Sequence, residues 1–305
     1  MLNVDVGYLA HFSRMKRLRE ELLKRALSIH SYEHLDNDLF VSLAGDQISD
    51  EIRIWGRYER RFLDFVGERI FSALSPANKR CLDIGANIGT HSLFFAKYFS
   101  EVIAFEPNPL AAAVLETNLK INGVSNVLVH NFGLSDSKRD AILSVGNTNI
   151  GAARIDAQSI SGQTLDASST KIMVHLEVGD DVIMDGPPIA FVKLDVEGHE
   201  PAVLRGMLRT ISTQKPVLMV EQLAPQIDLL TGTSEVSTIL STFGYSPYVF
   251  DRVALSKWRL LNNTIAILTG RMKFALTPAH KFEQRNYSSV LYIPNSPSQL
   301  CGNKS

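Results

Sequence analysis

The side chains best suited to chemistry lie close together in one segment, residues 191–200. Its charged and imidazole side chains are Lys193, Asp195, Glu197, His199 and Glu200. An apolar run predicts a strand over residues 189–194, and the period-two alternation of a strand places the lysine and the first two acids on one side of the chain. Neighbouring buried acids are costly unless they share a cation or a proton, and the lysine supplies such a cation. The segment therefore predicts a polar site at a strand end.

A turn of small residues, 83–89, has the sequence Asp-Ile-Gly-Ala-Asn-Ile-Gly and lies between a predicted strand over 80–84 and a predicted helix over 92–97. This order of elements is typical of the first β-turn-α unit of a doubly wound, nucleotide-binding sheet. Its glycines are spaced G-x-x-x-G, whereas a pyrophosphate-binding turn has G-x-G-x-x-G. A pyrophosphate therefore fits this turn less well.

The next predicted strand, residues 102–105, indicates which nucleotide is bound. It ends in Glu106, which comes 21 residues after Gly85. At this distance a strand-end carboxylate accepts hydrogen bonds from the hydroxyls of a ribose. S-adenosylmethionine (SAM) has a ribose but no phosphate, so the turn and the acid together favour SAM as the cofactor.

Three blocks of the sequence resemble, in the same order, the FkbM-type family of SAM-dependent methyltransferases. They are residues 83–89, residues 104–109 (Ala-Phe-Glu-Pro-Asn-Pro) and residues 191–200 (Phe-Val-Lys-Leu-Asp-Val-Glu-Gly-His-Glu). The resemblance covers roughly residues 58–270. It implies an α/β, Rossmann-like fold of the class I methyltransferases, with a mostly parallel seven-stranded sheet and helices on both faces. The activity it implies is O-methylation of a hydroxyl on a sugar, a glycan or a small natural product.

The resemblance also implies which residues bind SAM. They are Asp83, Gly85, Asn87, Gly89, Thr90, Glu106 and Asn108, with Tyr58 and Glu59 from an upstream block that closes over the methionine end of the cofactor. For catalysis we expect Asp195, His199 and Glu197. Methyl transfer to an alcohol needs a base that removes its proton, and either Asp195 or His199 suits that role. Asp195 also suits the binding of the methionine amino group, and the sequence leaves these roles open.

The polar segment has two other interpretations. Glu221, after a strand predicted over 217–220, adds an acid at the same sheet edge, so a bound divalent cation is an alternative. Its ligands would be Asp195, Glu197, His199 or Glu221. Acids are common polar endings of strands, so we expect chemistry without a metal. Glu200 and His199 also have a structural interpretation, in which they complement the dipole and cap of the following helix.

Composition and charge exclude several classes of protein. The 31 basic residues nearly balance the 32 acidic ones, so no overall field recruits nucleic acid or an anionic membrane. The two cysteines, Cys81 and Cys301, make neither a disulfide framework nor a C-x-x-C metal pattern. No stretch reaches the roughly 18 uninterrupted apolar residues of a membrane span. We therefore expect a cytoplasmic enzyme with a small-molecule or glycan acceptor and no nucleic-acid partner. A homodimer is left open.

The chain divides into three expected parts. Residues 1–50 form an N-terminal helical extension, residues 51–270 the SAM-dependent methyltransferase domain, and residues 271–305 a C-terminal covering segment and tail. Strands and helices alternate within the domain, which predicts a parallel sheet covered on both faces. Two runs, 141–145 and 171–178, predict an antiparallel insertion, and the polar loop between them is expected to contact substrate. Further strands are predicted over 127–130 and 265–268, and helices over 8–30, 58–74, 111–121, 200–212 and 235–243.

Two other functions fit parts of the sequence. A nicotinamide-dependent oxidoreductase on a related sheet is disfavoured by the missing third glycine of the turn. A non-catalytic SAM-binding module that serves a partner protein is disfavoured by the complete set of acids in residues 195–200.

Overall fold

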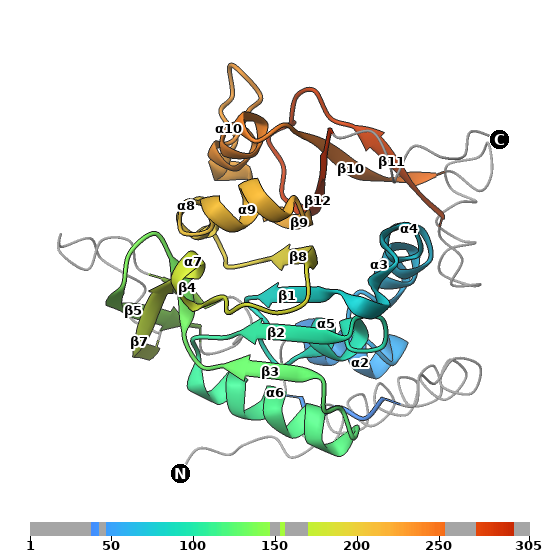
Figure 1. The fold of residues 1–305 in the computed structure, drawn as a ribbon, viewed down its shortest axis with the longest axis vertical. Coiled ribbons are helices and arrows are strands. Elements are labelled where there is room, and N and C mark those ends of the chain that lie inside the picture. Colours follow the sequence, from blue (N-terminus) through green and yellow to red (C-terminus); the bar gives the residue numbers. More distant parts are fainter. Residues whose placement is uncertain (1–37, 43–46, 147–152, 156–169, 254–272, 296–305) are drawn as a thin grey trace, which may run out of the picture.

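The computed structural model has a central sheet of eight strands in the order β11-β10-β12-β9-β8-β1-β2-β3 (Figure 1). The structure describes residues 38–42, 47–146, 153–155, 170–253 and 273–295. The strands of this sheet are β1 (Arg80–Ile84), β2 (Glu101–Phe105), β3 (Val127–His130), β8 (Ile189–Leu194), β9 (Val217–Gln222), β10 (Tyr245–Val253), β11 (Lys273–Pro278) and β12 (Tyr287–Pro294).

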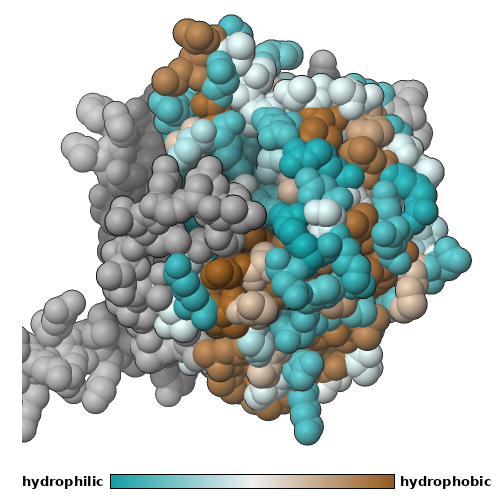
Figure 2. Space-filling model, turned by 90° about the vertical axis from the view of Figure 1, so that its left-hand side faces the viewer, coloured by the Kyte–Doolittle hydropathy of each residue, from teal (hydrophilic) through white to brown (hydrophobic). Residues whose placement is uncertain are grey.

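Five neighbouring strands end at the same edge of the sheet. β3, β2, β1, β8 and β9 pair in parallel, whereas β12 runs antiparallel between β9 and β10. The chain moves outward from β1 to β2 and β3, then returns to the other side of β1 with β8 and β9. The point between β1 and β8 is therefore the topological switch point, where ligands bind in open α/β sheets. This edge lies on the left of Figure 1 and faces the viewer in Figure 2, where hydrophilic and hydrophobic patches adjoin each other.

Helices cover both faces of the sheet, which confirms the expected Rossmann-like α/β fold. They are α2 (Gln47–Trp55), α3 (Arg60–Val66), the π-helical η1 (Gly67–Phe71), α4 (Ser72–Leu74), η2 (Pro76–Asn78), α5 (Thr90–Phe95), α6 (Pro109–Ile121), α7 (Gly179–Val182), α8 (Glu200–Arg205), α9 (Leu208–Gln214), η4 (Ala224–Gln226) and α10 (Glu235–Thr242). α3, η1 and α5 supply Leu63, Phe71 and Phe95 to one face, where they pack with Cys81 and Phe191.

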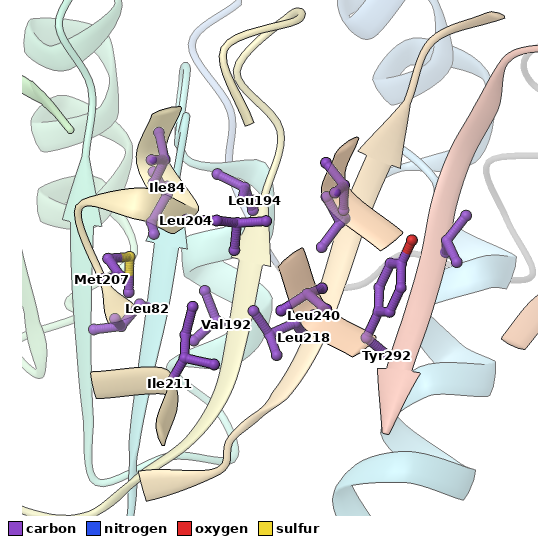
Figure 3. Packing of buried hydrophobic residues seen from close by; sticks show 14 of the residues in the cluster. Leu82, Ile84, Val192, Leu194, Leu204, Met207, Ile211, Leu218, Leu240 and Tyr292 are labelled. Atoms are coloured by element: carbon purple, nitrogen blue, oxygen red, sulfur yellow. The ribbon is translucent and has the colours of Figure 1, made fainter. Parts of the chain in front are cut away.

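The opposite face of the sheet packs on α8, α9 and α10. Leu82 of β1 and Val192 of β8 share one buried cluster with Leu204, Ile211 and Leu240 from these helices (Figure 3). Successive residues of β1, Cys81 and Leu82, thus enter different clusters, as the period of a strand requires. Burial on both faces explains why the parallel strands read as continuous apolar runs.

A second, smaller sheet stands beside the carboxyl edge. Its strands are β4 (Gly133–Ser135), β5 (Arg139–Val145), β6 (Arg154–Ile155) and β7 (Thr170–Val178), in the order β4-β7-β5-β6. β5 and β7 pair antiparallel, which confirms the predicted insertion. Most of the polar loop between them lies outside the described residues, and so do the predicted helix over 8–30 and the predicted strand over 265–268.

Three expectations about the fold are corrected. The sheet has eight strands rather than seven, because β11 pairs with the outer side of β10. Residues 287–294, expected in a covering segment, form β12 inside the sheet, where Val290 and Tyr292 are buried. Pro278 and Pro294 are the last residues of β11 and β12. The helix predicted over 200–212 is broken near Gly206, where a β-carbon would lie 2.0 Å from the carbonyl oxygen of Ser135.

Within the described parts of the chain, none of the helices combines the length and the apolar character that crossing a bilayer requires.

Candidate functional site

The glycine turn after β1 packs directly on the chain that leaves β8. Gly85 has φ +78°, and a β-carbon there would lie 1.8 Å from the carbonyl oxygen of Asp195. The amide of Asp195 donates a hydrogen bond of 3.1 Å to the carbonyl of Ile84. Only glycine suits position 85, because the backbone there is left-handed and because Asp195 approaches it so closely. The glycine turn (residues 83–89) and the polar segment (residues 191–200) therefore meet at the switch point.

The carboxylate of Glu106, at the end of β2, is held by the backbone. Its Oε2 accepts from the amide of Asn87 and its Oε1 from the amide of Asn108, both at 2.8 Å. Burial raises the pKa of Glu106 to about 7, although the two amides act to lower it. Each carboxylate oxygen accepts more than one hydrogen bond, so capacity remains for two hydroxyl donors.

A cavity of about 230 Å³ lies over these strand ends. Seven of the predicted site residues line it: Tyr58, Gly85, Asn87, Thr90, Glu106, Asp195 and Glu197. Leu143 and Ile155 of the small sheet line the same cavity, so the insertion forms one of its walls. Burial, followed by the nearby acids Glu59 and Asp195, raises the pKa of the Tyr58 phenol, which therefore remains a hydrogen-bond donor at neutral pH.

Four other predicted cofactor residues support the cavity without being among its lining residues. Asp83 is fully buried and accepts a hydrogen bond of 2.6 Å from the hydroxyl of Ser92. Asn108 caps α6, and Gly89 occupies the N-cap of α5 with φ +86°. Glu59 lies 3.2 Å from Nε2 of His91.

His91, unlike Glu59, lines the main cavity, and the sequence analysis did not single it out. Its place next to Thr90 in the first turn after the glycine motif is the signal that points to it. His91 is buried, and its ring meets that of Tyr58 edge-on.

His199 lies apart from the other predicted catalytic residues. Its Nε2 is 2.9 Å from the hydroxyl of Ser135 on β4, and it is not among the described residues that line the cavity. Burial and the nearby guanidinium of Arg139 lower the pKa of His199 to about 4. The imidazole is therefore neutral near pH 7 and contacts the small sheet, whereas Asp195 lines the cavity.

Three carboxylates gather at the ends of β8 and β9. One oxygen from each of Asp195, Glu197 and Glu221 can be chosen so that all lie within 4.8 Å of one another. Burial, then Asp195 and Glu197, raises the pKa of Glu221 to about 9. Oε2 of Glu221 is buried without a hydrogen-bond partner among the described residues. The three groups thus hold fewer than three negative charges near neutral pH.

Lys193 is the cation that faces this cluster. Its Nζ lies 3.4 Å from Oδ2 of Asp195 and 3.6 Å from Oδ1 of Asp83, and it donates a hydrogen bond of 2.7 Å to the carbonyl of Gly85. Burial alone would lower the pKa of Lys193, but the Asp195 and Asp83 carboxylates raise it above its usual value. The lysine therefore stays charged and holds Asp195 beside the glycine turn.

Arg154 of β6 brings a second cation to the cluster. Its guanidinium lies 3.7 Å from Oε2 of Glu197. Burial and the charge of Asp195 raise the pKa of Glu197, whereas Arg154 acts to lower it. This ion pair joins the small sheet to the strand-end acids.

Comparison with known proteins gives a consistent result. The methyltransferase FkbM domain matches residues 83–247, which is more than half of the chain. Methyltransferase 1 of Beauveria bassiana is 26% identical over 186 residues, covering 53% of this chain and 74% of that protein. The hexuronic acid methyltransferase AglP of Haloferax volcanii is 31% identical over 139 residues, covering 45% of this chain and 53% of that protein.

A solved structure of methyltransferase FkbM from Methylobacillus flagellatus aligns with a TM-score of 0.39 and 17% identity. The alignment covers 70% of this chain and 43% of that one.

Proposed function

The chain belongs to the family of the methyltransferase FkbM domain, and from this premise we propose that it transfers the methyl group of SAM to a hydroxyl oxygen of a sugar, a glycan or a small natural product. The observation that carries the proposal is the carboxylate of Glu106, held by two backbone amides at the edge of a cavity that also contains Asp195. A preorganised hydrogen-bond acceptor, Glu106, and a candidate base, Asp195, thus face the same cavity.

The residues around the glycine turn fit SAM. Glu106 offers its free lone pairs to the ribose hydroxyls, and the turn at Gly85 provides a surface without a side chain. The acids near Lys193 suit the cationic methionine end, and Tyr58 adds a donor at the same end of the cavity. When bound, SAM supplies a methyl group on a positively charged sulfur, which is an electrophile.

The base that we propose is Asp195. Its carboxylate lines the cavity, and Lys193 at 3.4 Å fixes its position. An alcohol loses its proton as its oxygen gains the methyl group, so Asp195 would take this proton at Oδ1 or Oδ2. Holding the acceptor in place beside Asp195 would contribute much of the rate.

The acceptor class rests on the relatives and on the cavity. AglP is named for the methylation of a hexuronic acid, which is a sugar derivative. The cavity of this chain combines acids with aliphatic residues such as Leu143 and Ile155 from the small sheet. A neutral polyol that presents one hydroxyl to the acids and a less polar face to the insertion suits this lining.

Calorimetric titration with SAM, S-adenosylhomocysteine and NAD tests the cofactor. We expect both sulfur compounds to bind and NAD to bind negligibly, whereas tighter binding of NAD would support an oxidoreductase. Incubation of a metabolite extract with radiolabelled SAM then tests the reaction. Radiolabel recovered in a methyl ether that survives alkali supports O-methylation of a hydroxyl. Binding of SAM without transfer to any hydroxyl acceptor would support a non-catalytic module instead.

A further inference from the structure

Glu200, the first residue of α8, is a fully buried acid with three hydrogen-bond donors around it. Its Oε1 accepts from the backbone amides of Val196 and Gly198, both at 3.1 Å. Its Oε2 accepts from Nε2 of Gln226 at 2.8 Å. All three partners are donors, and the two oxygens of the Glu200 side chain accept from them.

The two backbone contacts hold a strained turn. Glu197 has φ +54° and Gly198 has φ +104°, so two successive residues adopt left-handed backbone. For a residue with a side chain this conformation is unfavourable and persists only where the surroundings enforce it. Asp195, two residues before Glu197, is fixed from the other side by the hydrogen bond that its amide donates to the carbonyl of Ile84. The turn that carries two of the three clustered acids is therefore held between β1 and Glu200.

The third contact reaches the segment that follows β9. Gln226 lies at the end of η4, and its Oε1 accepts from the amide of Leu223 at 2.8 Å. The side-chain oxygen of Gln226 thus accepts a hydrogen bond within its own turn, and the side-chain nitrogen donates one to Glu200. Glu221 is only two residues before Leu223. One carboxylate consequently joins both segments that supply the acid cluster.

We propose that Glu200 is a positioning residue that fixes the turn bearing Asp195 and Glu197 against the strand end bearing Glu221, so that the three carboxylates meet at the cavity. Its effect on turnover rests on the proposed methyltransferase function. Complementing the dipole of α8 is a weaker account of Glu200, because the dipole explains neither the contact to Gln226 nor the buried contacts to the turn.

A reciprocal exchange tests this role. Glu200→Gln places an amide nitrogen opposite the amide nitrogen of Gln226, and turning the Gln226 amide over would sacrifice its bond to Leu223. Gln226→Glu alone places two carboxylates against each other. The double variant Glu200→Gln/Gln226→Glu restores a donor facing an acceptor, and the glutamine oxygen at position 200 still accepts from the turn. The two single losses are therefore expected to be non-additive.

Amide hydrogen exchange and enzyme kinetics measure the effect of this side-chain swap. Amide hydrogen exchange at Val196 and Gly198 is expected to quicken about tenfold in Glu200→Gln and to return towards the wild-type rate in the double variant. The kcat for methyl transfer is expected to fall by about 10²-fold in the single variant, the scale of a displacement of roughly 1 Å, and to recover in the double variant. The Kd for SAM is expected to change much less than kcat, because Glu106 is untouched.

Asp180 provides the matched control. Its carboxylate also accepts from two backbone amides, those of Arg209 and Thr210, but at α9 and away from the cavity. Asp180→Asn is expected to lower the thermal midpoint while leaving kcat near the wild-type value. An equal loss of kcat in Asp180→Asn would show that general destabilisation explains the result and would overturn the proposal.

Unchanged amide hydrogen exchange in Glu200→Gln would also overturn the proposal. So would a double variant whose hydrogen exchange and kcat are no closer to the wild-type values than those of the single variant. If Glu200→Gln does not fold, a folded double variant with wild-type exchange supports the role, and a double variant that also fails to fold contradicts it. If the wild-type protein transfers no methyl group, the proposed function fails, while the exchange measurements still decide the role of Glu200.

Discussion

Two acids at the ends of parallel strands, Glu106 directly after β2 and Glu221 near the end of β9, have opposite surroundings. Both have a pKa raised by burial, to about 7 and about 9 respectively. Both oxygens of Glu106 accept backbone hydrogen bonds. Glu221 has a buried oxygen without a partner among the described residues and lies beside Asp195 and Glu197.

The difference separates an acid held by hydrogen bonds from a cluster of acids that repel one another. Glu106 is held in one position before any ligand arrives, so its remaining lone pairs are preorganised for hydroxyl donors. Glu221 and its neighbours repel one another and are relieved by a proton or a cation. Perturbed acids of this kind concentrate at functional sites, where they commonly reduce stability. This contrast agrees with the proposal that SAM binds at the end of β2 and that Asp195, beside Glu221, removes the proton.

The largest effect is expected from Asp195→Asn, which keeps the shape of the side chain and removes its charge. Loss of a general base typically lowers turnover by roughly 10²–10⁴-fold. We expect kcat to fall within that range and the Kd for SAM to rise much less, since Glu106 remains. Single-turnover transfer from radiolabelled SAM, together with calorimetric titration, measures both quantities.

His199→Gln and EDTA are the controls for this variant. Because His199 contacts Ser135 outside the cavity lining, we expect His199→Gln to retain most of the turnover. A larger loss there than in Asp195→Asn would transfer the base to the imidazole. Activity that disappears in EDTA and returns with Mg²⁺ would make Asp195, Glu197 and Glu221 metal ligands instead.

Glu106→Ala is expected to have the next largest effect, on the other side of the comparison. Hydrogen bonds to a charged group contribute about 1.5–3 kcal/mol, so we expect the affinity for SAM to fall by that amount. The kcat at saturating SAM is expected to change little, which is the reverse of Asp195→Asn. Calorimetric titration measures the affinity. Wild-type binding by the variant would mean that the ribose is held elsewhere.

The pH dependence of SAM binding sharpens the assignment of Glu106. Because its pKa in the folded protein is about 7, the carboxyl is mostly protonated at pH 6 and mostly ionised at pH 8. Ribose hydroxyls donate hydrogen bonds, so the ionised form binds them better, and the Kd is expected to fall about tenfold between these two pH values. Titrations of the wild type and of Glu106→Gln isolate this effect. Parallel pH profiles of the two proteins would contradict it.

Local patterns predicted the parts of the site that are close in sequence. β2 and β8 are apolar runs that are followed directly by the acids Glu106 and Asp195, and the spacing from Gly85 to Glu106 is a property of one β-turn-α-β unit, so both features were visible in the sequence. The contact of Glu200 with Gln226, by contrast, joins residues 26 apart through the packing of two strands. The break at Gly206 depends on Ser135, and the place of β12 depends on β9 and β10. Such long-range pairings leave no local pattern.

The same limit explains the outcome for His199 and Lys193. Both belong to one polar segment, and alternation along β8 correctly directed Lys193 towards Asp195. His199 follows a left-handed turn, after which the alternation of the strand no longer applies, and its ring lies against β4. A strand pattern therefore predicts side-chain directions only up to the first positive φ.

The smallest effect is expected from Glu221→Gln, on stability rather than turnover. The pKa of Glu221 is about 9 in the folded protein against 4.5 in an ordinary environment. The folded state therefore retains a proton that the unfolded chain releases, and the free energy of unfolding of the wild type falls as the pH rises from about 4.5 to about 9. Glutamine at this position carries no such proton, so the free energy of unfolding of the variant does not fall over this pH range for that reason.

We expect Glu221→Gln to be more stable than the wild type by about 1–2 kcal/mol at pH 8, with little difference at pH 5. Urea denaturation at the two pH values measures this, and Glu116→Gln, on the exposed side of α6, is the control for removing an acid elsewhere. The same gain at both pH values would attribute the effect to packing. A gain confined to high pH would show that the acid cluster is held at a cost in stability, as expected where a fold keeps a proton acceptor ready for its substrate.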